Sequence, residues 1–294
     1  MENMEKGGTT AKSLGLVVKR DPGAMRKADG LESWLIARGC RVVRKTSDPP
    51  NCQHTACIQE PAPPDLDCVV VLGGDGTFLS AVRWLGDQQA PLLGIKFGQV
   101  GFLAEASEES LYNAVESILD QPFATLPRMR LRAEVWRKDE KVASEVVLND
   151  VVINKGALAR LAHIKTYVND GFLTDYRADG LIVATPTGST AYSLAAGGPI
   201  IYPTVLGILM TPICPFTLTN RPLIVPDDAV IKIQLAEKSA DIILTFDGQV
   251  GLPINEQHTI VVRKDPLPVN TIVLQDRDFF DVLKAKLRWS GSRV

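Results

Sequence analysis

The chain is poor in several residue types that point directly to particular functions. Its 294 residues include 3 histidines and 5 cysteines, and 6% of them are aromatic. The net charge at pH 7 is −2, so no excess of basic residues indicates a nucleic acid or a membrane as partner. The odd number and irregular spacing of the cysteines fit free thiols in a reducing cytoplasm, which is the expected location.

Metal and membrane signals are also scarce. Cys52, His54 and Cys57 resemble a fragment of a zinc site, but no second ligand pair follows at a workable spacing, so no protein-bound metal is expected. The apolar stretch 200–213 is interrupted by proline and is too short to span a bilayer. Residues 1–12 have neither the apolar core of a signal peptide nor the Arg-rich bias of a transit peptide.

The first part of the chain alternates between short apolar runs and helical patterns. Such alternation predicts a parallel sheet with helices on both faces. The expected strands lie at 14–18, from 42 onward, at 68–72 and at 91–95, and the expected helices lie at 24–38, 78–85 and 107–119.

The second part has a different texture, with strand-like runs separated by Gly, Asn, Asp and Pro. It predicts two packed sheets. The expected strands lie at 130–137, 145–153, 164–168, 180–184, 230–235, 242–246 and 259–262. Arg128, Arg130 and Arg132 alternate as on one solvated strand face. An amphipathic helix at 276–288 is expected to bury Phe279, Phe280, Leu283 and Leu287.

The most informative motif is the run 73–77, Gly-Gly-Asp-Gly-Thr, which follows a buried strand and precedes a helix. Glycines let backbone N–H groups approach an anion closely, and a helix N-terminus favours phosphate. Asp75 would repel phosphates unless it serves as a base or a metal contact, so the loop suggests phosphoryl chemistry. The alternative is an ordinary Gly-Asp-Gly turn with a capped helix. The run matches neither the P-loop pattern nor GxGxxG.

Two further stretches could hold a ligand. A loop rich in hydroxyl side chains and glycine follows the strand 180–184 and suits ribose or phosphate groups, although a polar turn with helix capping is the alternative. Asn149 carries an amide that can read a base edge or a ribose, although an Asn-Asp turn explains it equally well. The run 246–249 by itself predicts a hairpin turn.

Together these stretches resemble the ATP-dependent NAD kinases, also called inorganic polyphosphate/ATP-NAD kinases. The resemblance covers nearly the whole chain after residue 14. Gly-Gly-Asp-Gly alone is shared with phosphofructokinases and diacylglycerol-type lipid kinases, whereas the run 185–193 followed by Gly-Gly-Pro is far more specific. The matching segments are 73–77, 98–103, 149–150, 179–199, 220–222, 247–249 and 279–283 with Trp289.

The resemblance implies an α/β plus β fold. An N-terminal Rossmann-like parallel-sheet domain (1–123 plus 272–294) would precede a C-terminal β-rich, sandwich-like domain (124–271), and the C-terminal helix would return to the first domain. It implies transfer of the γ-phosphoryl group of ATP to the 2′-hydroxyl of the adenosine ribose of NAD⁺. Asp75 would accept the hydroxyl proton, and Mg²⁺ or another divalent metal would arrive with ATP. A homodimer or homotetramer is implied as well.

The resemblance also implies a set of dinucleotide contacts. They are Asp75, Gly76, Asn149, Asp150, Arg160, Arg177, Asp179, Thr190, Ala191, Tyr192, Ser193, Leu194, Ala195 and Gln249. Two positions depart from the family pattern, because Asp150 stands where many members have the longer Glu and Leu103 stands where some have an aromatic residue. A lipid or sugar kinase that shares the glycine loop and a non-catalytic NADP(H) sensor are the competing hypotheses.

Overall fold

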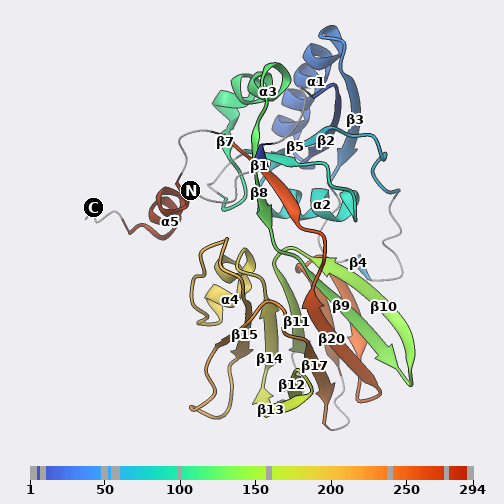
Figure 1. Cartoon of the computed structure of the whole chain (residues 1–294), viewed down its shortest axis with the longest axis vertical. Helices are drawn as coiled ribbons and strands as arrows, with labels where there is room; N and C mark the ends of the chain where they lie inside the picture. The colour runs from blue at the N-terminus through green and yellow to red at the C-terminus, as the bar shows by residue number, and fades with distance from the viewer. Residues whose placement is uncertain are drawn as a thin grey trace. The chain divides into compact units, whose positions relative to one another are not determined.

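The computed structural model of the chain describes residues 5–6, 11–47, 52–53, 60–97, 101–156, 161–236, 241–274 and 278–289. The chain forms two compact units (Figure 1). The first comprises residues 1–48, 59–127 and 269–294, and the second comprises residues 49–58 and 128–268. The second unit thus takes the short segment 49–58 as well as the long segment 128–268, and the chain returns to the first unit at residue 269.

The first unit contains a sheet whose central strands are all parallel, as expected. Four of them lie in the order β3-β2-β5-β6, and β21 adds in parallel beyond β6. The central strand β5 is buried along its whole length. The strands of this sheet are β1 (Glu5–Lys6), β2 (Ser13–Val18), β3 (Arg41–Thr46), β5 (Cys68–Gly73), β6 (Leu92–Lys96), β7 (Ala106–Ser107), β8 (Ala124–Arg128) and β21 (Val269–Val273).

Three helices cover both faces of this sheet. The apolar sides of α1 (Pro22–Ala37) and α3 (Leu111–Asp120) share one buried cluster with alternate residues of β2 and β5. The helix α2 (Asp75–Leu85) packs on the opposite face, where a Cβ on Gly15 would lie 2.9 Å from the ring of Trp84. Among the described residues, no helix combines the length and apolar character needed to cross a membrane.

The second unit is built from two sheets that are antiparallel apart from one short edge pairing. One sheet has the order β10-β9-β20-β17-β12-β13, and the other has the order β16-β15-β14-β11-β18-β19-β4. The strands of the first are β9 (Leu131–Arg137), β10 (Glu140–Val147), β12 (Ala162–Val168), β13 (Gly171–Ala178), β17 (Ile231–Leu235) and β20 (His258–Lys264). The strands of the second are β4 (Cys52–Gln53), β11 (Asp150–Lys155), β14 (Gly180–Ala184), β15 (Ile208–Ile213), β16 (Leu223–Val225), β18 (Ile242–Phe246) and β19 (Val250–Ile254).

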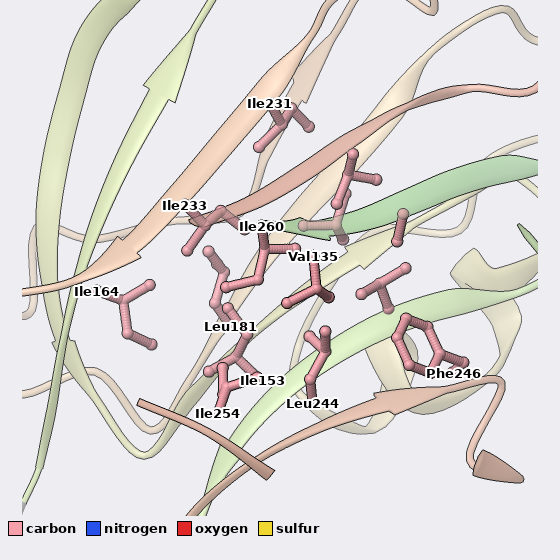
Figure 2. Packing of buried hydrophobic residues seen from close by; sticks show 14 of the residues in the cluster. Val135, Ile153, Ile164, Leu181, Ile231, Ile233, Leu244, Phe246, Ile254 and Ile260 are labelled. Atoms are coloured by element: carbon pink, nitrogen blue, oxygen red, sulfur yellow. The ribbon is translucent and has the colours of Figure 1, made fainter. Parts of the chain in front are cut away.

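Branched aliphatic side chains fill the space between these two sheets (Figure 2). Ile231 and Ile233 alternate inward along β17, and Ile153 and Leu181 belong to the same cluster from the other sheet. Burying one such side chain contributes about 1.5–3 kcal/mol. The expected architecture, an α/β unit followed by a β-rich unit of two packed sheets, is confirmed.

The C-terminal helix α5 (Phe279–Leu287) belongs to the first unit. It begins later than the expected residue 276 because Asp278 caps it, its carboxylate accepting the N–H of Phe280 at 3.2 Å. The expected apolar stripe is partly wrong, since Phe280 is 52% exposed whereas Val282 and Leu283 are buried. Contact with the rest of the unit includes Lys286, whose ammonium lies 5.6 Å from the centre of the Phe102 ring.

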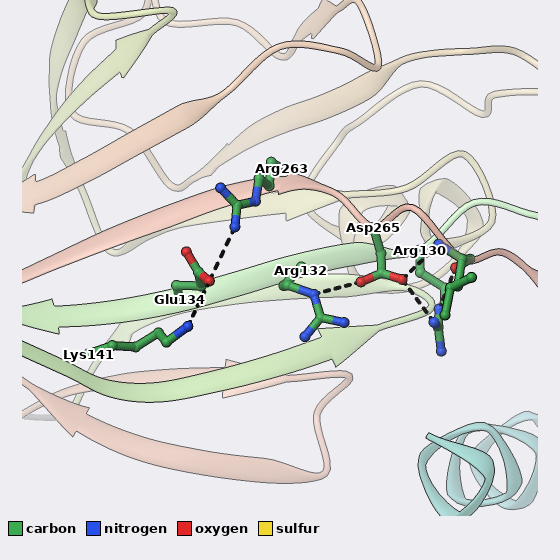
Figure 3. A network of polar contacts seen from close by, with 7 residues as sticks. Arg130, Arg132, Glu134, Lys141, Arg263 and Asp265 are labelled. Carbon is green, nitrogen blue, oxygen red and sulfur yellow. Dashed lines mark hydrogen bonds and ion pairs between the residues drawn. The ribbon is translucent and has the colours of Figure 1, made fainter. Parts of the chain in front are cut away.

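The arginines at the start of β9 are not on a solvated face, contrary to the sequence-based expectation. Arg130 and Asp265 are each 2% exposed, and Arg130 Nη2 lies 2.8 Å from Asp265 Oδ1. Arg132 Nε reaches the other oxygen at 2.7 Å, and Arg130 Nε donates to the carbonyl of Leu267 (Figure 3). Asp265 therefore joins the segment that enters the second unit to the segment that leaves it.

Removing Asp265 should leave two arginines without their common partner, one of them fully buried. We expect Asp265→Ala to lower the free energy of unfolding by about 3–5 kcal/mol, as measured by chemical denaturation. The matched control is Asp281→Ala on α5, where the ion pair with Lys284 is exposed and the change should stay within about 1 kcal/mol. Equal losses in the two variants would contradict this account of the buried cluster.

Candidate functional site

Asp75 lies in the first turn of α2. The expected helix start at residue 78, which would have placed Asp75 in a loop before the helix, is therefore wrong. Its two carboxylate oxygens accept main-chain N–H groups from the segment after β6. Phe102 N donates to Oδ2 and Leu103 N donates to Oδ1, each at 3.1 Å. The carboxylate is thus oriented from one side, while each oxygen keeps a further lone pair that can accept a proton.

The glycines around Asp75 fall into two groups. A Cβ on Gly101 would lie 2.3 Å from Asp75 Oδ1, and a Cβ on Gly73 would lie 2.3 Å from the Thr77 hydroxyl. These two glycines are therefore required by close approach within the unit. Among the described residues, no atom lies within 4 Å of the position that a Cβ on Gly74 or Gly76 would take. Packing against the described residues therefore does not explain why glycine stands at these two positions.

In the second unit, the loop after β14 is fastened to the main chain of Asn149. Thr185 N donates to Asn149 O at 2.8 Å, and the Thr185 hydroxyl donates to Leu148 O at 2.6 Å. A Cβ on Gly188 would lie 2.1 Å from Asn149 O, so only glycine fits against this carbonyl. The hydroxyl-rich loop and Asn149 are consequently neighbours, although 36 residues of sequence separate Asn149 from Thr185.

Asp247 approaches the same segment from the turn between β18 and β19. Its carboxylate accepts the N–H groups of Leu148 at 2.9 Å, Asn149 at 2.7 Å and Asp150 at 3.1 Å. The main chain of Asn149 is therefore hydrogen-bonded through both its N–H group, to Asp247, and its carbonyl, to Thr185. In the part of the chain that the structure describes, the Asn149 side-chain amide has no hydrogen-bond partner.

Asp150 opens β11 and is only 4% exposed. Burial, and secondly the negative charge of Asp247, raise the pKa of the Asp150 carboxyl from 3.8 to about 7. Near neutral pH a large fraction of this carboxyl group is therefore protonated and able to donate a hydrogen bond.

The segment 190–195 supplies both exposed and buried groups. It spans the end of a 3₁₀ turn and the short helix α4 (Tyr192–Ala195). Tyr192 is 43% exposed, whereas Ser193 is buried and its hydroxyl lies 2.8 Å from that of Thr211. Ser193 thus serves packing in this structure, while the half-exposed Thr190, Ala191 and Leu194 and the exposed Tyr192 and Ala195 are accessible.

The remaining expected residues are not all in one place. Gln249 follows Asp247 in the β18–β19 turn and lies at the Asn149 end of the sheet. Arg177 and Asp179 precede β14, at the strand end opposite Thr185, and a five-residue strand spans about 17 Å. Arg177 stacks on Phe216, and Asp179 pairs with Lys155 at 3.2 Å. Arg160 lies outside the described residues.

Two residues of this region were not singled out from the sequence alone. Thr187 Oγ1 is buried without a hydrogen-bond partner among the described residues, and its place within the hydroxyl-rich run was the available signal. For Asp247 the sequence by itself predicts only a turn, whereas its three N–H partners lie 97 to 99 positions earlier. No local pattern could have indicated those contacts.

The raised pKa of Asp150 makes stability depend on pH. The unfolded chain loses this proton above pH 3.8, while the folded protein keeps it until about pH 7. Folding therefore becomes less favourable across that window, by up to roughly 1.4 kcal/mol for each pH unit. We expect Asp150→Asn to gain stability relative to the unmodified protein between pH 4 and pH 8 in urea denaturation. The exposed Asp139→Asn is the control, and a pH-independent difference for Asp150→Asn would contradict the burial effect.

Residues 14–123 match the family model described as the ATP-NAD kinase N-terminal domain, and residues 148–274 match the ATP-NAD kinase C-terminal domain. An NAD kinase of Desulfatibacillum aliphaticivorans is 56% identical over 284 residues, which cover 96% of this chain and 100% of that protein. An NAD kinase of Geobacter sulfurreducens is 43% identical over 273 residues, which cover 92% of this chain and 95% of that protein.

Solved structures of similar proteins share the fold. The crystal structure of yeast NADH kinase complexed with NADH has a TM-score of 0.82 at 25% identity, covering 97% of this chain and 90% of that one. An NAD kinase from Archaeoglobus fulgidus in complex with ATP has a TM-score of 0.71 at 23% identity, covering 95% of this chain and all of the other. With both family models and long relatives matching, the chain belongs to the ATP-NAD kinase family.

Proposed function

We propose that this protein is an NAD kinase that transfers the γ-phosphoryl group of ATP to the 2′-hydroxyl of the adenosine ribose of NAD⁺. The observation that carries the proposal is the Asp75 carboxylate, which two main-chain N–H groups hold at the first turn of α2, among the glycines of the run 73–77. The NAD kinase relatives and the NADH complex of the yeast neighbour support the choice of substrate.

In this proposal Asp75 accepts the proton of the attacking ribose hydroxyl. The hydroxyl oxygen forms a bond to the γ-phosphorus, the bond from that phosphorus to the bridging oxygen breaks, and ADP leaves with the electron pair. A ribose hydroxyl is a very weak acid, so a carboxylate helps mainly as the proton becomes acidic late in the transfer. The N–H groups of Phe102 and Leu103 keep the carboxylate in one orientation while it does so.

The phosphates of ATP would bind at the glycine-rich start of α2. A helix N-terminus presents unpaired N–H groups and a partial positive charge. The run 73–77 contains no lysine, so Mg²⁺ or another divalent metal would enter as part of the metal–ATP substrate. The described residues contain no group of three or more His, Cys, Asp or Glu side chains that could hold a metal ion.

The dinucleotide would be recognised mainly by the second unit. Asn149 offers an amide without a described partner, and Asp150 offers a carboxyl group that is partly protonated near neutral pH. The accessible residues of the segment 190–195 and the Gln249 side chain complete this end of the sheet. A polar ligand that meets such a surface gains both donors and acceptors.

We propose a homodimer or homotetramer, located in the cytoplasm. Arg177 and Asp179 lie at the opposite end of β14 from the loop beside Asn149. Their proposed contact with the dinucleotide is therefore easier to satisfy if a second copy supplies them. Light scattering of the purified protein reports the oligomeric state directly.

Two competing functions fit the structure less well. A lipid or sugar kinase would share the glycine loop but would have no use for the amide and carboxyl groups at 149–150. A non-catalytic NADP(H) sensor would not need a carboxylate that two N–H groups orient at the first turn of α2. Incubation with ATP, Mg²⁺ and NAD⁺, followed by an assay for NADP⁺, separates all three functions.

The first test of the proposal is Asp75→Asn, which keeps the side-chain shape but removes the basic oxygen and one of the two acceptors for the N–H groups of Phe102 and Leu103. We expect turnover to fall by about 10²–10⁴-fold. The affinity for NAD⁺ should change much less. Asp87→Asn, an exposed position just beyond the other end of α2, serves as the control. Near-normal turnover in Asp75→Asn would show that another group accepts the proton.

The second test is Asn149→Ala. Loss of the amide should weaken NAD⁺ binding by about 1–3 kcal/mol, because a ligand group is left without its partner. Titration calorimetry measures both affinities, and the affinity for ATP should be nearly unchanged. Asn113→Ala on the exposed side of α3 is the matched control. Equal losses for both nucleotides would indicate a general disturbance of folding.

A further inference from the structure

The turn that carries Asp247 makes more contacts than a hairpin turn requires. Asp247 and Gly248 both have left-handed backbone angles, with φ of +50° and +61°, as in the tight turns that suit Asp-Gly pairs. Beyond that turn, the Asp247 carboxylate accepts three consecutive N–H groups, those of residues 148–150. Its own N–H also donates to Asp150 O at 2.9 Å.

A second hairpin in the same unit shows what a turn needs by itself. Asn169 and Asp170, between β12 and β13, have φ of +49° and +63° and are exposed. Among the described residues, the Asp170 carboxylate has no hydrogen-bond partner. At the position that matches Asp247, Asn169 makes the same pair of bonds to Val230 that Asp247 makes to Asp150, since Val230 N donates to Asn169 Oδ1 at 2.9 Å and Asn169 N donates to Val230 O at 3.0 Å. A turn of this kind therefore accounts for the bonds between Asp247 and Asp150. The N–H groups of Leu148 and Asn149, which Asp247 also holds, call for a separate explanation.

The pairing of β11 does not explain them either. From Asp150 onward β11 pairs with β14, and from Val151 onward it also pairs with β18. The residues that Asp247 holds stand at the start of this ladder and just before it. There the Asn149 carbonyl is bonded to Thr185 N, and Gly188 presses against it. The carboxylate supplies the one acceptor that fixes the N–H side of Asn149.

We propose that Asp247 is the positioning residue of dinucleotide recognition, because it fixes the main chain from which Asn149 and Asp150 present their side chains to the ligand. The inference rests on the proposed function. Asp247 need not touch the dinucleotide; it acts through the residues that do. Misplacing a binding group by a fraction of an ångström weakens its hydrogen bonds steeply.

The chemistry of the side chain makes the proposal specific. A carboxylate has acceptor sites on both oxygens and can serve three N–H groups. An asparagine at this position would turn an NH₂ group toward one N–H, leaving that donor without an acceptor. A glutamate would keep the charge but carry it one methylene too far, so both replacements should disturb the segment 148–150.

The experiment compares steady-state kinetics of Asp247→Asn, Asp247→Glu and the control Asp170→Asn. We expect KM for NAD⁺ to rise about 10- to 100-fold in both Asp247 variants, with KM for ATP and kcat changing far less. Asp170→Asn should behave like the unmodified protein. A purely electrostatic role would spare Asp247→Glu, and a purely structural role would move both KM values and kcat together; either result overturns the proposal.

A double variant tests whether Asp247 acts through Asn149. If Asp247 acts through Asn149, Asp247→Asn should raise KM for NAD⁺ much less in the Asn149→Ala background than in the unmodified protein. Full additivity would overturn the positioning role. If Asp247→Asn does not unfold cooperatively, Asp247→Glu carries the test, and failure of both variants to fold would also overturn it.

Backbone hydrogen exchange gives a readout that does not depend on the reaction. The amides of residues 148–150 should exchange faster in Asp247→Asn than in Asp170→Asn, while those of β12 should be unchanged. The unmodified protein separates the two levels of inference. If it forms no NADP⁺ from ATP and NAD⁺, the proposed function fails. If the unmodified protein forms NADP⁺ and the Asp247 variants have the same kinetics, only the positioning role of Asp247 fails.

Discussion

Main-chain N–H groups that the strand ladders leave without partners need acceptors, and at three places this chain supplies them with aspartate. Asp67 accepts the N–H groups of residues 12 and 13 at 2.7 and 2.8 Å, Asp75 holds those of residues 102 and 103, and Asp247 holds those of residues 148–150. A buried N–H without a partner is costly, and a charged acceptor makes the bond about twice as strong as a neutral one. The placement of the site residues depends on this solution, because the carboxylates fix the backbone that carries them.

Much of the fold follows from local pattern, and the exceptions have physical causes. Strand–helix alternation in the first unit and the period of two along β17 follow directly from side-chain burial, so the α/β plus β architecture was visible in the sequence. The burial of Arg130 was not, because its partner Asp265 is 135 positions away. The face that α5 buries was also missed. Helical spacing allows either Phe280 or Val282 to point inward, and only the docking surface decides between them.

The candidate site, like the fold, contains residues that the sequence indicates and contacts that it does not. Asp75 and Asn149 stood out because glycine or a following strand marked them, whereas the contacts of Asp247 depend on a pairing of β11 with β18 that no local motif shows. Arg177 and Asp179 adjoin the hydroxyl-rich loop in sequence. An intervening strand nevertheless places them at its opposite end, since a strand carries its two flanks apart by its full length. Motifs thus identify the chemistry of a site more reliably than its extent.

The glycines of the two units also separate requirements of the fold from requirements of a ligand. Gly73, Gly101 and Gly188 have neighbours at 2.1 to 2.3 Å from the position a Cβ would take, so the fold alone excludes larger residues there. Among the described residues, Gly74 and Gly76 have no such neighbour within 4 Å, and Gly74 has an extended backbone that any residue can adopt. Packing against the described residues therefore does not explain these two glycines. Glycine at a helix N-terminus, with the Asp75 carboxylate fixed beside it, fits a bulky anion that must approach the main chain closely, which supports a phosphate at this place.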